Sequence, residues 1–364
     1  MLLADLKAAT SVPDDLYRRY ELYGSVINKI SKGKSPGLLL ISGGHQRDSF
    51  SSTDNHLQHF AHAAKRTQFR KAATIAFREL QSRHILPTMI IAGDPFFGLL
   101  SAFLLRKKFS RKIPIQVSFH GEITKSGFGT GIKGRLQNLF IQKTIAKVES
   151  VRLVSNDQIH FAKKLFGVVD KQIVIAPVPL ISTFKRTTRS KKKVVAFVGR
   201  IHPQRGIGTW VEAMKNLSVK AEALIIGDGP LKSTFIEDLK EIPKVSVNAT
   251  GYISQSELEN TWAKISVLLS TAPFESYGMA MREAVLHGVP VVSMRNSGAQ
   301  NLHKECPKMI TLVDNAEEAA RAIEKVLNRP PSAVVVNKYK KDFLKAQESY
   351  LKSLAKSWLG NVGD

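Results

Sequence analysis

The chain has 364 residues, of which 43% are hydrophobic and 23% are charged, and its formal net charge is +24. This composition is typical of a folded globular protein and excludes disordered and fibrous classes, while the length predicts two domains rather than one core. A single cysteine excludes a disulfide within the chain and favours a reducing compartment.

Positive charge is concentrated in the first half of the chain. Residues 1–180 carry 27 basic and 12 acidic side chains, residues 181–193 carry 6 basic and no acidic ones, and residues 194–364 carry 21 and 18. A basic N-terminal half would attract phosphates, an anionic membrane surface or nucleic acid. A basic surface that serves only solubility is the plain alternative.

Neither a targeting signal nor a membrane span is expected. The N-terminus has an acid at Asp5 and no basic lead, unlike a signal peptide. The longest apolar run, about 95–105, is well short of the ~20 residues that span a bilayer. The sequence therefore predicts a cytoplasmic protein, either soluble or peripheral on the inner face of the cytoplasmic membrane.

Short apolar runs alternate with helical patterns through the first half, which predicts a parallel α/β sheet. The expected strands lie at 1–3, 38–42, 88–92, 115–119, 151–155 and 173–176. The expected helices lie at 15–30 and near 56–83, 96–108, 133–147 and 156–166. The basic segment that follows, 185–193, has no apolar periodicity and is interpreted as a linker between domains.

The same alternation restarts after the linker. The expected strands lie at 194–198, 223–226, 245–250, 267–270 and 289–293. The expected helices lie at 208–217, 231–241, 257–264, 277–287, 316–327 and 340–359. The chain is thus divided into an N-terminal domain (1–184), a linker (185–193) and a C-terminal domain (194–344), with a last helix at about 345–364 expected to pack back on the N-terminal domain.

The strongest chemical signal is the segment 273–293, PFESYGMAMREAVLHGVPVVS. A loop carrying Glu275 leads into a helix that begins near Gly278 and carries Glu283. A helix N-terminus offers free N–H groups to an anion, and a glycine there lets a ligand approach the backbone. Glu283 could accept hydrogen bonds from the vicinal hydroxyls of a ribose. On spacing alone, two solvated surface glutamates are the commoner explanation.

This segment resembles the Glu-x7-Glu signature of retaining, nucleotide-sugar-dependent glycosyltransferases with the GT-B fold. The resemblance implies that Glu275 contacts the donor sugar and that Glu283 holds the ribose hydroxyls. Tyr277 stands where the family usually has Phe. The matching positions are Glu275, Gly278, Glu283, Ala284, Gly288, Pro290 and Val291. The resemblance also implies donor contacts from Ser276, Tyr277, Gly278 and Met279.

Residues 198–206, VGRIHPQRG, are similar to the family's Gly-Arg-x(4)-Lys-Gly segment. The resemblance implies that Arg200 and Arg205 neutralise the donor diphosphate and the charge that grows on the leaving group. Arg205 replaces the usual Lys, which keeps the charge but changes the geometry of phosphate binding. The segments 225–231 and 250–253 also match in order, and the remaining donor-binding residues implied are Gly199, Gly227, Tyr252 and Ile253.

The first half resembles the family more weakly, over 88–98 and 116–121. The resemblance implies that His120 contacts the donor sugar or supports the acceptor, whereas a lone histidine after a strand is otherwise more often structural. Two departures concern the acceptor side. The family's Gly-Gly loop after the first strand is expected at 7–14, which has no glycine, and PVPL at 177–180 replaces an Asn-Gly-x-Asp motif.

No metal site or cofactor is expected, because the nucleotide sugar is a substrate and no Asp-x-Asp motif occurs. His56, His59 and His62 are spaced so that they drift around a helix, and no Cys or Asp partner is evident, so zinc is not expected. The GxGxxG pattern at 129–134 does not directly follow a strand and fails the context of a dinucleotide site. Residues 127–134 are expected to form a loop beside His120.

The sequence therefore predicts an α/β protein of GT-B type, with two Rossmann-like domains and a cleft between them. Its predicted function is retaining transfer of a sugar to a glycan or lipid-linked acceptor, in cell-envelope polysaccharide or glycolipid synthesis. Apolar and basic helices over 96–112 and 132–147 could lie on an anionic membrane, or could simply pack on the sheet. No nucleic-acid partner is expected, since no recognition motif occurs. The alternatives left open are a nucleic-acid- or membrane-binding protein on a degenerate GT-B fold and a sugar-nucleotide epimerase.

Overall fold

The computed structural model describes residues 14–32, 38–43, 48–51, 57–62, 68–109, 112–121, 123, 127–128, 131–182 and 192–359. The described residues fall into two compact units. The N-terminal unit comprises Met1–Pro179 and Ala346–Asp364, and the C-terminal unit comprises Leu180–Lys345.

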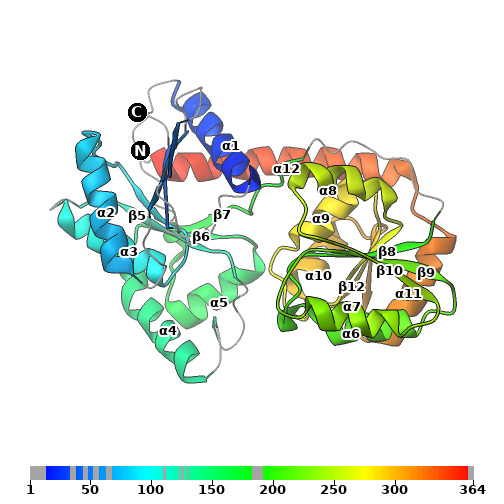
Figure 1. The fold of residues 1–364 in the computed structure, drawn as a ribbon. Helices are drawn as coiled ribbons and strands as arrows, with labels where there is room; N and C mark the ends of the chain where they lie inside the picture. The colour runs from blue at the N-terminus through cyan, green and yellow to red at the C-terminus, as the bar shows by residue number, and fades with distance from the viewer. Residues whose placement is uncertain are drawn as a thin grey trace. The chain divides into compact units, whose positions relative to one another are not determined.

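The C-terminal unit is built on one six-stranded parallel sheet (Figure 1). Its strands are β8 (Val194–Val198), β9 (Ala221–Ile226), β10 (Val245–Gly251), β11 (Val267–Ser270), β12 (Val291–Met294) and β13 (Ile310–Val313). Their order is β10-β9-β8-β11-β12-β13, the 3-2-1-4-5-6 order of doubly wound nucleotide-binding sheets. In such sheets, ligands bind at the carboxyl ends of the two strands where the order reverses, here β8 and β11.

Helices cover both faces of this sheet, so its strands are apolar on both sides. Along β8, Val195 and Phe197 face one core cluster while Val194 and Ala196 face the other. The first face is covered by α6 (Ile207–Lys215), α7 (Lys232–Lys240) and α11 (Ala316–Asn328). The second face is covered by α8 (Gln255–Thr261), α9 (Met279–Leu286), α10 (Ser297–Glu305) and the first half of α12 (Ala333–Leu359).

The N-terminal unit has two separate sheets among its described residues. The four-stranded sheet is parallel, in the order β4 (Ile90–Ala92), β5 (Ile115–Phe119), β6 (Ser150–Leu153) and β7 (Ile173–Ile175). The three-stranded sheet has the order β1 (Leu38–Gly43), β3 (Leu57–His62) and β2 (Asp48–Ser51), with β1 parallel and β2 antiparallel to β3. The unit's larger helices are α1 (Asp14–Ile30), α2 (Phe69–Ser82), α3 (Phe97–Lys108), α4 (Gly131–Thr144) and α5 (Asp157–Phe166).

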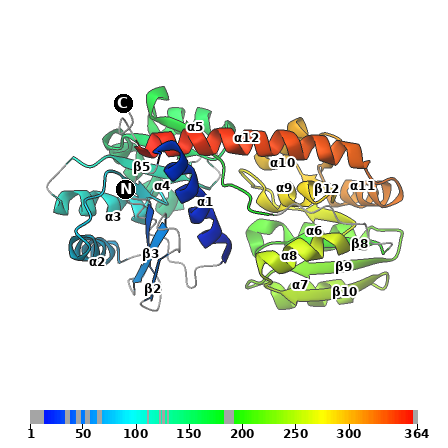
Figure 2. The same ribbon diagram turned by 90° about the horizontal axis from the view of Figure 1, so that it is seen from above.

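The last turns of α12 belong to the core of the N-terminal unit, where they pack against α1 (Figure 2). The rings of Tyr23 and Trp358 meet edge to face with centroids 5.3 Å apart. Trp358 Nε1 donates a hydrogen bond of 2.6 Å to Oε1 of Gln116, a buried residue of β5. The C-terminal helix is therefore fixed to the four-stranded sheet by a satisfied buried polar contact as well as by apolar packing.

Several local predictions differ from the structure. The prediction of a helix over 56–83 was wrong in its first part, because 57–62 is strand β3. The helical spacing assumed for His59 and His62 therefore does not apply. The loop expected over 127–134 is shorter, because α4 begins at Gly131. Strands β2 and β13 and helix α10 were missed, and α12 begins at Ala333 rather than 340.

Other predictions fall on residues outside the described ranges, namely the strand at 1–3, His56, and positions 185–191 of the linker. Residues 7–13, where a glycine-free loop was expected after the first strand, are also outside them. The expected absence of a glycine pair from that loop therefore stays a prediction.

Candidate functional site

The loops that follow β8 and β11 meet at the carboxyl edge of the sheet. Nη1 of Arg205, from the first loop, lies 2.5 Å from Oε2 of Glu275, from the second. The two side chains are 37% and 23% exposed, so a ligand can reach both. The Thr271 hydroxyl donates a hydrogen bond of 3.0 Å to the Arg205 carbonyl and holds the two loops together.

A small cavity of about 30 Å³ is lined by both members of this ion pair and by Gly278. The ends of β8 and β11 also line it. The cavity therefore lies at the switch point that the strand order identifies, with a charged pair in its lining.

The loops after β8 and β9 are joined through their backbones, and this contact requires glycine. Gly199 N–H donates to the Ile226 carbonyl at 3.0 Å, and Ile201 N–H donates to the Asp228 carbonyl at 2.9 Å. Gly227 has a φ of +137°, and a Cβ atom there would lie 1.9 Å from the Gly199 carbonyl oxygen. A side chain at position 227 would therefore push the two loops apart.

Asp228 continues this loop as a fixed negative charge. Its carboxylate accepts hydrogen bonds from the Lys232 ammonium at 2.9 Å and from the Gly229 N–H at 2.8 Å. These contacts, that of Lys232 first, hold the pKa of the Asp228 carboxyl below its ordinary value. The turn after β9 is thus stabilised at neutral pH by its own charged side chains.

The loop that carries Glu275 is held from below by α10. The Gly298 N–H donates a hydrogen bond of 2.6 Å to the Glu275 carbonyl. Asn296 caps α10 by accepting from the Ala299 N–H at 2.8 Å, and its Nδ2 donates to the Ala272 carbonyl at 2.9 Å. Sequence reasoning missed these supports, although Asn followed by Ser-Gly is a recognisable helix start.

Glu283 is buried on α9, with only 6% of its surface exposed. One of its carboxylate oxygens accepts a hydrogen bond of 3.2 Å from Nε2 of Gln255, the first residue of α8. Tyr252, just before α8, is 70% exposed, and Ile253 packs against the core of the unit. The structure therefore places Glu283 inside the unit and Glu275 at its surface.

Arg282 is a second buried charge on α9, and the sequence analysis did not single it out. Its guanidinium lies 4.2 Å from the centroid of the Tyr277 ring, and Nε donates to the Tyr277 carbonyl at 3.0 Å. Nη2 donates to Glu305 Oε1 at 2.8 Å. Arg282 thus connects the Glu275 loop to the end of α10 and orients the loop without lining the cavity.

The remaining predicted residues are not all brought together. Arg200 is exposed on the loop after β8. His120 belongs to the N-terminal unit, where it is half-buried at the carboxyl end of β5. The loop around it is anchored by the buried Gln158, whose Nε2 donates to the Gly121 carbonyl at 2.7 Å.

No three His, Cys, Asp or Glu side chains in the described ranges are grouped as metal ligands would be. No helix in the described part of the chain has both the length and the apolar character of a membrane span.

The fold is shown by solved structures of very different sequence. The sucrose-phosphate synthase of Thermosynechococcus elongatus superposes with a TM-score of 0.73 at 15% identity, covering 98% of this chain and 97% of that one. The Anabaena protein HepE, solved in complex with UDP-glucose, superposes with a TM-score of 0.68 at 14% identity, covering 99% of both chains. The predicted GT-B fold, with its Rossmann-like units, is confirmed.

Residues 181–343 match the family of glycosyl transferases group 1. The GDP-mannose-dependent alpha-mannosyltransferase of Corynebacterium glutamicum is 30% identical over 141 residues, which are 38% of this chain and 32% of that protein. The alignments with the first two curated relatives thus span about a third of those proteins.

Proposed function

We propose that the protein is a retaining glycosyltransferase that moves a sugar from a nucleoside-diphosphate donor to an acceptor hydroxyl. The observation that carries this proposal is the Arg205–Glu275 pair at the carboxyl ends of β8 and β11. It lies in the segment that matches the group 1 family and at the switch point where doubly wound sheets bind nucleotides.

The donor-side roles follow from charge and burial. The guanidinium groups of Arg200 and Arg205 neutralise the diphosphate, and Arg205 exchanges its carboxylate partner for a phosphate oxygen when the donor binds. Glu275 is then free to contact the sugar. Glu283, buried and acceptor-only when ionised, holds the ribose hydroxyls. The glycines and main-chain groups around Gly278 allow the donor to approach the backbone.

In the proposed reaction the bond between the anomeric carbon and the diphosphate oxygen breaks, and the acceptor oxygen bonds to the same face of that carbon. The acceptor proton passes to the departing diphosphate, so no separate base is required. Arg200 and Arg205 stabilise the charge on the leaving group, in place of a metal ion. His120 is the proposed contribution of the N-terminal unit, on the sugar and acceptor side.

The acceptor is proposed to be a glycan or lipid-linked glycan of the cell envelope. GDP and UDP sugars are the first donors to test, because the mannosyltransferase relative is GDP-mannose-dependent and HepE was solved with UDP-glucose.

The test is a thermal-shift titration with UDP, GDP, ADP and their common sugars, with and without magnesium. A ligand present at 100 times its Kd stabilises the native state by about 2.7 kcal/mol. We expect one nucleotide to raise the melting temperature, independently of magnesium, and Arg200→Ala to abolish the shift. Arg321→Ala, on the exposed side of α11, is the charge-matched control and should keep it.

A folded protein that responds to none of these ligands would contradict the proposal. The alternative would then be a binding protein built on the GT-B fold. Salt-dependent binding of the protein to duplex DNA would identify nucleic acid as its partner.

We also propose that the N-terminal unit contacts an anionic membrane through α4. Ile132, Leu136 and Leu139 form an exposed apolar stripe on this helix, with 81%, 62% and 46% of their surfaces accessible. Basic residues flank the stripe, and residues 123–148 contain no acidic residue. Apolar stripes bordered by Lys and Arg are typical of helices that lie in a bilayer interface.

The measurement is co-sedimentation with phosphatidylglycerol vesicles at rising salt. The wild type should bind at low ionic strength, and a variant with Ser at 132, 136 and 139 should not. Absence of binding by the wild type at low salt would refute the membrane contact and leave the transferase proposal untouched.

A further inference from the structure

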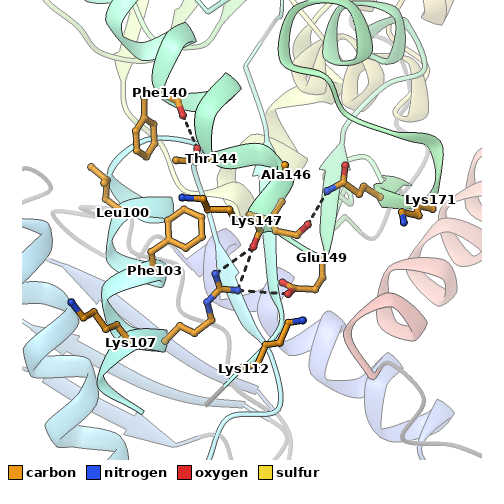
Figure 3. A pocket seen from close by; sticks show the side chains of 13 residues that line it. Leu100, Phe103, Lys107, Lys112, Phe140, Thr144, Ala146, Lys147, Glu149 and Lys171 are labelled. Carbon is orange, nitrogen blue, oxygen red and sulfur yellow. Dashed lines mark hydrogen bonds and ion pairs between the residues drawn. The ribbon is translucent and has the colours of Figure 1, made fainter. Parts of the chain in front are cut away.

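A hollow of about 1,200 Å³ lies in the N-terminal unit, at the amino ends of β5, β6 and β7 (Figure 3). His120 follows the carboxyl end of β5, so the hollow is at the opposite edge of the sheet from the residue proposed for transfer. We call it the amino-end hollow. Its polar and charged lining residues are Arg106, Lys107, Lys112, Thr144, Lys147, Glu149, Lys171 and Gln172.

Four of these residues are lysines from separate parts of the fold, and all four are exposed. Lys107 lies in the last turn of α3, Lys112 precedes β5, and Lys147 and Lys171 precede β6 and β7. Within the described ranges, none of these four ammonium groups contacts a carboxylate. Several unneutralised cations around one concave surface produce a positive potential there, which favours a bound anion.

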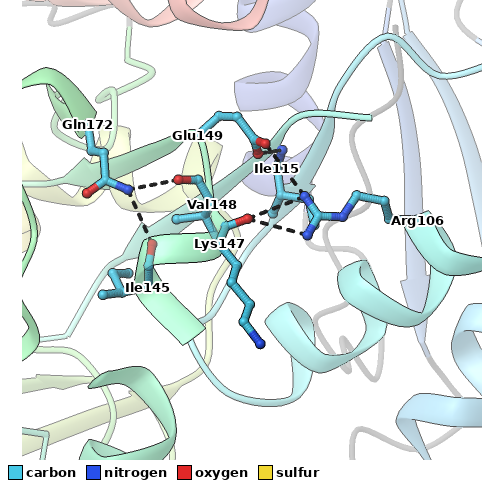
Figure 4. A network of polar contacts seen from close by, with 7 residues as sticks. All are labelled: Arg106, Ile115, Ile145, Lys147, Val148, Glu149 and Gln172. Atoms are coloured by element: carbon cyan, nitrogen blue, oxygen red, sulfur yellow. Dashed lines mark hydrogen bonds and ion pairs between the residues drawn. The ribbon is translucent and has the colours of Figure 1, made fainter. Parts of the chain in front are cut away.

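Glu149 is the sole acid in the lining, and it is already engaged. One carboxylate oxygen accepts a hydrogen bond of 2.6 Å from the Ile115 N–H, and the other lies 3.6 Å from Nη1 of Arg106 (Figure 4). Its charge is therefore directed toward the wall of the hollow and offsets that of Arg106. The charge of the four lysines remains for a ligand.

The wall that carries Lys147 is held in place from two sides. Arg106 donates to the Lys147 carbonyl from Nη1 and Nη2, at 3.3 and 3.4 Å. The buried Gln172 donates from Nε2 to the carbonyls of Ile145 and Val148, at 3.2 and 2.8 Å. These contacts fix the backbone at the base of the lysines before any ligand arrives, which lowers the entropic cost of binding.

One side of the hollow is apolar. Leu100 and Phe103 of α3 and Phe140 of α4 line it and are half-buried (Figure 3). The Arg106 guanidinium lies 5.2 Å from the centroid of the Phe103 ring. A small inorganic anion would leave this side in contact with water, whereas a phosphate attached to an apolar group would cover it.

We propose that the amino-end hollow binds a phosphate ester whose organic part is apolar or aromatic, at a site separate from the candidate donor site. The lysines that line the hollow attract the phosphate, and the organic part lies against Phe103 and Phe140. The same chemistry is offered by a soluble phosphate ester and by the headgroup of an anionic phospholipid.

The first experiment is calorimetric titration of the full chain with phenyl phosphate, a soluble ester with an aromatic body, at constant ionic strength. We expect one molecule to bind per chain and the variant Lys147→Ala/Lys171→Ala to bind about tenfold more weakly. The control Lys71→Ala/Lys164→Ala removes the same charge from exposed positions of α2 and α5 that do not line the hollow, and it should bind like the wild type.

The second experiment identifies the source of the phosphate. Phenyl phosphate that displaces the protein from phosphatidylglycerol vesicles would show that a lipid headgroup enters the hollow. Phenyl phosphate that binds without displacing it would show a soluble ester as the ligand. Failure of phenyl phosphate to bind, or equal weakening in both double variants, would overturn the proposal, and neither result depends on transferase activity.

Discussion

Each unit buries one arginine among its described residues, and the two arginines have different partners. Arg282 of the C-terminal unit binds the Glu305 carboxylate and the Tyr277 carbonyl in the candidate site loop. Arg152 of the N-terminal unit binds neutral groups, the Tyr23 hydroxyl at 2.9 Å and the carbonyls of Ala176 and Pro177 at 2.8 and 2.9 Å.

The difference extends to the units as wholes. In the C-terminal unit, one continuous parallel sheet brings the matching motifs to its carboxyl edge, and residues 180–345 carry 25 basic and 16 acidic side chains. The N-terminal unit has two separate sheets, a strongly basic sequence and few family motifs. The C-terminal unit is thus constrained by backbone geometry, which leaves a signature in the sequence, whereas the N-terminal unit carries few such motifs.

The largest effect expected is that of Arg282→Ala. The substitution removes a buried cation that joins the Glu275 loop to α10, together with its hydrogen bond to the Tyr277 carbonyl. We expect it to lower the free energy of unfolding by about 3–4 kcal/mol and to weaken donor binding. Urea denaturation and the thermal-shift assay measure the two effects.

Arg152→Ala is the matched control in the other unit. It removes a buried guanidinium that has no carboxylate partner, so it should destabilise by about 2 kcal/mol and leave the intrinsic donor affinity unchanged. Equal losses of donor affinity in both variants would show that Arg282 has no special role in orienting the candidate site loop.

Glu275→Gln should reduce turnover while preserving donor binding. The amide cannot stabilise positive charge on the reacting sugar, and Arg205 keeps its access to the diphosphate once its carboxylate partner is neutral. We expect kcat to fall about 100-fold with the donor-induced thermal shift retained. Glu237→Gln, on an exposed turn of α7, makes the same chemical change away from the site. Full activity of Glu275→Gln would remove Glu275 from the proposed mechanism.

Substitutions at two glycines, one in each unit, test whether the loops of the C-terminal unit are the more rigid. Ala at Gly227 would place Cβ 1.9 Å from a backbone oxygen, that of Gly199. Ala at Gly127, which has a φ of +73°, would place Cβ 2.4 Å from the side chain of Asn138, which can rotate away. We expect Gly227→Ala to destabilise by about 2–3 kcal/mol and Gly127→Ala by about 1 kcal/mol. Similar losses of unfolding free energy in the two variants would show that the loops of the C-terminal unit are no more rigid than those of the N-terminal unit.

Some of the elements and residues that these substitutions test could be predicted from the sequence. Strands β8 and β11 were predicted with the bounds they have, because buried parallel strands are continuous apolar runs. The residues that meet at their ends, Arg205 and Glu275, were proposed through the family resemblance. Spacing alone could not bring them together, since 70 residues separate them along the chain.

What the sequence did not reveal depends on contacts made by elements that were themselves missed. The role of Arg282 requires Glu305, which ends α10, a short polar helix with no clear apolar period. Strand β3 was mistaken for helix because its segment, LQHFAH, has too few apolar residues to distinguish the two periods. The amino-end hollow is lined by residues from four separate segments of the chain, so its lysines belong to one surface only in the folded unit.

The smallest effect is expected at Tyr277, which stands where the family usually has Phe. Its ring is 8% exposed and faces the Arg282 guanidinium. Tyr277→Phe keeps that ring, so we expect stability within about 0.5 kcal/mol of wild type and donor affinity within about twofold. Tyr277→Leu removes the ring and should cost about 1 kcal/mol through the lost contact with the cation. Urea denaturation and donor titration compare the two variants. If Tyr277→Phe lost as much stability and donor affinity as Tyr277→Leu, the hydroxyl rather than the ring would be the important group. The Tyr that replaces the family's Phe would then contribute to the chemistry of the site rather than to its packing.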